Sequence, residues 1–193
     1  MPTSATRTMT RVAGFAWLVV AAAGVRSAIV VDDGDWTVTY TIFSLALLAG
    51  AVLSIALAAR ATRGCNRPWL RMVGLGVSAL GGLACVVAWA LPLWMTLLGV
   101  GFAIVAVASA PGPRRPLTLL AAGQLVGIVV MFAGIAAEIG RRDEWGDYPA
   151  AGGIAVVTVA VMTIVALLGL GRTVGQPAGT QQDMSLAGVS GTA

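Results

Sequence analysis

The chain has no histidine and no lysine, and only 10% of its residues carry a charge. The missing histidine removes the commonest metal ligand and general base, and with it any haem held by histidine. The two cysteines, Cys65 and Cys85, are predicted at different membrane depths and belong to no C-x-x-C motif. We therefore expect no disulfide, no zinc site and no other cofactor.

Motifs of catalysis are missing as well. The sequence contains no H-E-x-x-H, no G-x-S-x-G and no phosphate-binding loop, so it does not predict an enzyme. The glycines at Gly74 and Gly76 imitate a dinucleotide-binding motif, but they lie within an apolar run that follows no strand. The net charge of +4 comes from arginines in short loops, which indicates membrane topology and not binding to nucleic acid.

What the chain does contain is apolar sequence, with 58% hydrophobic residues and a mean hydropathy of +0.90. Such a composition is typical of membrane proteins, and apolar runs near 20 residues predict spanning helices. We expect an all-α membrane protein, a six-helix bundle with short loops. The six predicted spans are 12–31, 37–59, 72–91, 93–110, 117–140 and 150–170. Residues 1–11 are then a cytoplasmic N-terminal segment, and the Gly-, Ser-, Thr- and Gln-rich residues 171–193 are predicted to be a disordered cytoplasmic tail.

Two parts of this predicted topology have alternatives. Almost no polar linker separates the third and fourth spans, so they form either two helices joined by a tight turn at Pro92 or one re-entrant pair. The first span follows two arginines and contains small residues, as a cleaved secretory signal does. We favour a retained span, because the apolar run continues through Val31 and reaches full spanning length.

The arginines predict the orientation. With six spans, nine arginines lie on the side of the two termini: Arg7, Arg11, Arg60, Arg63, Arg67, Arg71, Arg114, Arg115 and Arg172. Only Arg141 and Arg142 lie in loops on the other side, among six acidic residues. Because cytoplasmic loops carry an excess of Lys and Arg, both termini are predicted in the cytoplasm of a bacterial-type inner membrane. Residues 111–116, PGPRRP, are predicted to be a rigid basic turn.

Two ionisable residues fall inside predicted spans, Arg26 near the outer end of the first and Glu138 near the outer end of the fifth. A charge in the membrane is costly unless it is paired or reaches water, so we predict that the two form an ion pair. Polar residues of the second span recur at helical spacing at the same depth: Thr37, Tyr40, Thr41 and Ser44. These groups either line an outer vestibule for a cation or small polar solute, or form an ion pair that fixes helix register beneath an ordinary polar rim. We favour the second interpretation, because ionisable side chains this close to an interface can reach water.

Small residues recur at helix-packing spacing in three spans. They are Gly50, Ser54 and Ala58 in the second, Gly74, Ser78 and Gly82 in the third, and Gly123 and Gly127 in the fifth. Since small residues let helix backbones approach closely in lipid, we expect them to pack the helices of one chain together. Gln124 is the one amide deep in a span, and we expect it to hydrogen-bond to a neighbouring helix.

These features leave two main hypotheses for function. Tiny loops and abundant packing motifs favour a structural or accessory protein of a membrane complex, whose partners are the lipid bilayer and another membrane protein or a second copy of the chain. The alternative is a small transporter subunit. The size, six short-looped spans and cytoplasmic termini are similar to the substrate-binding membrane subunits of vitamin importers, a likeness of architecture in which no binding motif can be placed.

Overall fold

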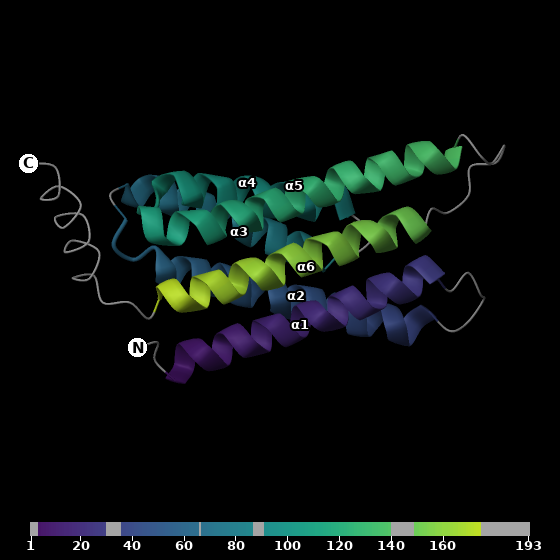
Figure 1. Cartoon of the computed structure of the whole chain (residues 1–193), viewed down its shortest axis with the longest axis horizontal. Helices are drawn as coiled ribbons and strands as arrows, with labels where there is room; N and C mark the ends of the chain where they lie inside the picture. The colour runs from purple at the N-terminus through teal and green to yellow at the C-terminus, as the bar shows by residue number, and fades with distance from the viewer. Residues whose placement is uncertain (1–3, 30–35, 66, 87–90, 140–148, 175–193) are drawn as a thin grey trace, which may run out of the picture.

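The computed structural model describes residues 4–29, 36–65, 67–86, 91–139 and 149–174, which form six helices and no strand (Figure 1). The helices are α1 (Ser4–Ile29), α2 (Trp36–Ala61), α3 (Pro68–Ala84), α4 (Leu91–Ala108), α5 (Pro111–Ile139) and α6 (Pro149–Thr173). One helix corresponds to each predicted span. Four of them, α1, α2, α5 and α6, are long and apolar enough to cross a membrane, which is consistent with a membrane protein.

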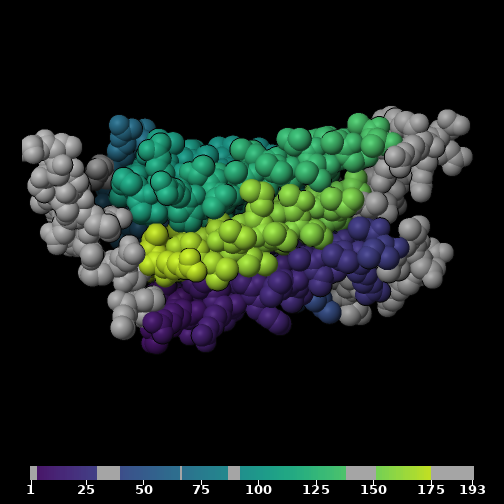
Figure 2. Space-filling model, in the orientation of Figure 1, coloured from purple at the N-terminus to yellow at the C-terminus, as the bar shows by residue number. Residues whose placement is uncertain are grey.

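The helices alternate in direction, and α6 occupies the central place among them. It packs against α1, α5 and α2, while α4 packs against both α3 and α5. On the face shown in Figure 2, α5, α6 and α1 lie side by side along the length of the bundle, with α6 between the other two. Short connections between consecutive helices give antiparallel neighbours of this kind.

One apolar core runs through the bundle, with buried residues from α1, α2, α4, α5 and α6, and the partly buried Leu75 and Ala84 of α3 pack against it. Its largest members, Trp17, Trp94 and Phe102, are fully buried. Large apolar side chains also cover the outer surface, where Phe15 is 68% and Val129 is 67% exposed. So wide an apolar surface is unfavourable in water, whereas lipid solvates it. The exposed side of these helices is therefore as apolar as the buried side, which suits a bilayer.

Small residues bring helix backbones into contact, both at the predicted Gly74 and at Gly24 and Gly153, which were not among the predicted packing residues. A methyl group added at Gly74 of α3 would lie 2.8 Å from the carbonyl oxygen of Gly101 in α4. At the α1–α6 interface, a methyl group added at Gly24 would lie 2.9 Å from the carbonyl oxygen of Gly153. In lipid these close approaches supply the van der Waals contact that holds helices together.

The α3–α4 hairpin differs from the predicted spans. Helix α3 ends at Ala84, seven residues before the predicted end, so Cys85 follows the helix and does not lie in the middle of a span. Cys85 is buried and, like Cys65, is a free thiol. With 17 and 18 residues, α3 and α4 are separate helices and shorter than the others, about 25 Å long at 1.5 Å per residue.

The prediction of a rigid turn at residues 111–116 was wrong. These residues are the beginning of α5, and the amide of Arg114 donates to the carbonyl oxygen of Ala110, 3.2 Å away. The first helical residues have no intrahelical acceptor for their amides, so Pro111 and Pro113 cost no hydrogen bond there. Only Pro116 lies deep enough to remove one.

Candidate functional site

Gln124 of α5 is a fully buried polar side chain in the middle of the bundle. Its exposed fraction is 0%, and its Nε2 donates to Thr163 Oγ1 of α6 across 3.5 Å. This long hydrogen bond agrees with the expected link between helices. The Oε1 atom of Gln124 has no hydrogen-bond partner among the described residues, so the amide is only half satisfied.

The surroundings of Gln124 are tightly packed and apolar. Gly99 of α4 lies against its side chain, because a methyl group added there would be 3.1 Å from Gln124 Cβ. One turn along α5, a methyl group at Gly127 would lie 3.5 Å from the sulfur of Met95. The part of the chain that the structure describes contains no group of His, Cys, Asp and Glu suited to a metal ion. This arrangement can join α4, α5 and α6.

A second buried polar contact joins α1 to α2. Trp17 Nε1 donates to Ser54 Oγ at 3.1 Å, and this hydroxyl in turn donates to the carbonyl oxygen of Gly50 at 2.7 Å. The indole ring lies directly on Gly50, where an added methyl group would come within 3.0 Å of Nε1. Sequence reasoning assigned Gly50 and Ser54 to packing but did not find Trp17, although a tryptophan in mid-span needs an acceptor for its N–H.

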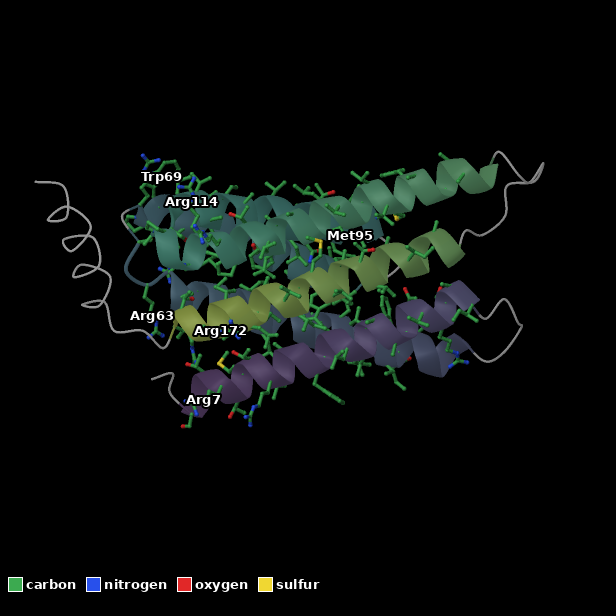
Figure 3. The ribbon with its side chains drawn as sticks, in the orientation of Figure 1. Arg7, Arg63, Trp69, Met95, Arg114 and Arg172 are labelled. Carbon is green, nitrogen blue, oxygen red and sulfur yellow. The ribbon has the colours of Figure 1, made fainter. Side chains whose placement is uncertain are left out.

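The arginines define the basic end of the bundle, where α1, α3 and α5 begin and α2, α4 and α6 end. Figure 3 shows Arg7, Arg63, Arg114 and Arg172 spread across this end, together with Trp69. Seven arginines of this end are exposed: Arg7, Arg11, Arg63, Arg67, Arg114, Arg115 and Arg172. The basic end therefore presents positive charge from four separate parts of the chain.

One arginine of the basic end, Arg71 of α3, has a structural contact instead. Its Nη2 donates to the carbonyl oxygen of Ala59 at 2.9 Å, and its Nε donates to Thr62 Oγ1 at 3.0 Å. The last carbonyls of a helix have no intrahelical donor, so Arg71 satisfies one of them and ties α3 to the end of α2. Nothing in the neighbouring residues predicts that Arg71 differs from the other arginines of this end.

The predicted ion pair lies partly outside the described residues. Arg26 is exposed in the last turn of α1, where a cation also interacts favourably with the helix dipole. Glu138 belongs to the end of α5, but its side chain is outside the described residues. Helix α6 packs against both α1 and α5 and lies between them (Figure 1). The pair stays a prediction.

The predicted outer vestibule is described only in part. Thr37 lies in the first turn of α2, and its side chain is outside the described residues. Tyr40 and Thr41 are exposed, whereas Ser44 is half-buried with an Oγ atom that has no hydrogen-bond partner in the described chain. The vestibule formed by these four residues stays a prediction.

No family model, curated protein or solved structure matches this chain. Length, apolarity and packing define its class as a helical bundle suited to a membrane.

Proposed function

We propose that the protein is a structural or accessory component of a membrane complex, and that its bundle is a closed unit without a path for solute. The supporting observation is the burial around Gln124. Its exposed fraction is 0%, and it is enclosed by helices whose backbones nearly touch. A solute-binding subunit needs a polar cavity at this depth, whereas a helix-packing unit needs the dense contacts that surround Gln124.

We further propose six spans with both termini in the cytoplasm of a bacterial-type inner membrane. Helices of 17 residues or more reach the lower limit of spanning length, so α3 and α4 can cross together with the four longer helices. The support for the orientation is the collection of nine arginines at one end of the bundle.

The transporter alternative has one specific observation in its favour. Gln124 Oε1 is buried without a hydrogen-bond partner in the described chain, and an unsatisfied amide oxygen in lipid is costly. A polar solute or a water molecule passing between α4, α5 and α6 would satisfy this atom. Water access to position 124 therefore separates the two functions.

Thiol labelling measures that access. In a chain carrying Cys65→Ser and Cys85→Ala, we expect Gln124→Cys to remain unlabelled by a water-soluble maleimide until the protein is denatured. Gly64→Cys, which lies exposed in the α2–α3 loop, is the matched control and should react at once in detergent. Rapid labelling of Gln124→Cys in the folded protein would refute the closed bundle and favour the transporter.

The same background tests the orientation. In intact cells, a membrane-impermeant maleimide should not label Gly64→Cys, and opening the cells should make this position reactive. Gly146→Cys, in the predicted outer loop, should react from outside. The reverse pattern would overturn the proposed topology while leaving the closed bundle intact.

A further inference from the structure

The α2–α3 corner, which we define as Arg63, Arg67 and Trp69, combines exposed charge with an exposed aromatic ring. Both arginines are exposed, and Trp69, in the first turn of α3, is 66% exposed. Tryptophan is enriched at membrane–water interfaces, where its apolar body meets lipid and its N–H meets polar groups. The corner therefore has the composition of a surface placed at the headgroup level.

This corner is held by hydrogen bonds. The amide of Thr62 donates to the carbonyl oxygen of Ala58 at 3.1 Å, and that of Cys65 donates to the carbonyl oxygen of Thr62 at 3.2 Å. On the other side of the loop, Arg71 fixes α3 to the end of α2 through its two hydrogen bonds. A fixed backbone loses less entropy when its side chains bind a ligand.

An apolar stripe continues from the corner along α3. Trp69, Met72, Val73 and Leu80 follow at helical spacing, and each is between 48% and 66% exposed. Two arginines therefore lie at one end of a stripe that is open to lipid. A free phosphate ion would use the arginines alone, whereas a phospholipid would use the arginines and the stripe together.

Charge complementarity indicates which lipid fits. The other exposed arginines of the basic end come from α1, α5 and α6, and Figure 3 labels Arg7, Arg114 and Arg172 among them. The first turns of α1, α3 and α5, the helices that begin at this end, contain no acidic residue. Guanidinium groups bind phosphate through paired hydrogen bonds, and a zwitterionic headgroup would bring an ammonium group into this positive field. An anionic headgroup is thus favoured over a neutral one.

We propose that the α2–α3 corner binds an anionic phospholipid of the surrounding leaflet. Arg63 and Arg67 bind the phosphate, Trp69 lies beside the glycerol, and an acyl chain follows Met72, Val73 and Leu80. The inference depends only on this corner, so it holds whether the bundle is an accessory unit or a transporter.

The test measures which lipid lies next to Trp69. The full chain is reconstituted into vesicles that contain both phosphatidylcholine and phosphatidylglycerol. In one preparation the phosphatidylglycerol carries brominated acyl chains, and in the other part of the phosphatidylcholine carries them. Quenching of Trp69 is the difference in fluorescence between the natural chain and a Trp69→Phe variant. At low salt we expect phosphatidylglycerol to be preferred by about fivefold for each arginine engaged. Arg63→Gln with Arg67→Gln should bring the ratio close to one.

The matched control is Arg26→Gln, which removes an exposed arginine from the other end of the bundle and should leave the preference unchanged. Equal quenching by both lipids in the natural chain would refute the proposal. A preference for phosphatidylglycerol that remains after the double substitution would also refute the proposal. The same holds if Arg26→Gln removes the preference.

Two further measurements keep the proposal falsifiable. Native mass spectrometry of the natural chain in neutral detergent should retain phosphatidylglycerol in preference to phosphatidylcholine. Loss of that preference on addition of millimolar glycerol phosphate would mean that the corner binds free phosphate groups, which would overturn the assignment to a lipid.

Discussion

Replacing Gly24 with alanine should weaken the α1–α6 interface more than any change in helix propensity can offset. The added methyl group would lie 2.9 Å from the carbonyl oxygen of Gly153 and 3.1 Å from Cγ1 of Val156. A carbon and a carbonyl oxygen in contact normally stay about 3.3–3.6 Å apart. The backbones of α1 and α6 must therefore separate, and the interface loses contacts along both helices.

The magnitude follows from a comparison within the same helix. Gly14 of α1 has nothing within 4 Å of an added methyl group, so Gly14→Ala changes helix propensity without a clash. Alanine is favoured over glycine by about 0.5–1 kcal/mol inside a helix, and this gain is common to both variants. Their difference therefore isolates the overpacking cost, which is about 1–3 kcal/mol.

The assay is unfolding of the purified protein in mixed micelles of mild detergent and increasing SDS, followed by circular dichroism and tryptophan fluorescence. Gly14→Ala should unfold at the same SDS fraction as the natural chain or later, and Gly24→Ala should unfold earlier. Gly153→Ala, from the other side of the contact, should match Gly24→Ala, because its methyl group would lie 2.9 Å from the amide nitrogen of Ala28. Equal midpoints for Gly14→Ala and Gly24→Ala would refute the α1–α6 packing.

Substitutions at three other polar contacts are tested by the same unfolding assay. Trp17→Phe removes the hydrogen bond to Ser54 and should cost about 0.6–2 kcal/mol, the range for interhelical bonds in lipid; no loss would count against that contact. Arg71→Gln removes two hydrogen bonds from a charged donor and should cost about 1.5–3 kcal/mol, and an unchanged midpoint would contradict its structural role. If Arg26 and Glu138 form a pair, Arg26→Gln and Glu138→Gln should each destabilise the bundle, while the double variant partly recovers; strictly additive losses would dismiss the pair.

The polar contacts show how far sequence reasoning reaches into the candidate site. Gln124 was predicted to bond to a neighbouring helix, because an amide in lipid has few other partners, and its contact with Thr163 agrees. The partner itself could not be predicted, since it depends on which face of α6 meets α5. Arg71 shows the same limit, because nothing in the local sequence separates it from the exposed Arg67.

The sequence by itself determined that the protein is an apolar helical bundle, that it has six helices and that most of its arginines lie at one end. These properties follow from composition and from where apolar runs begin and end, and both can be read along the chain. The start of α5 was an exception, because Pro111 and Pro113 suggest a turn but also suit the first residues of a helix, whose amides have no acceptor within the helix.

Only the tertiary structure decided which helices touch and which residues their contacts use. The central place of α6 and the contact between Gly24 and Gly153 both depend on the packing of α1 against α6, two helices that lie more than a hundred residues apart in the chain. In lipid the hydrophobic effect does not favour burying one face of an all-apolar helix over another. The periodicity of its apolar residues therefore does not identify its buried side. The buried face is determined by the close packing of small residues on two neighbouring helices. Such packing depends on the surfaces of both helices and cannot be predicted from either one alone.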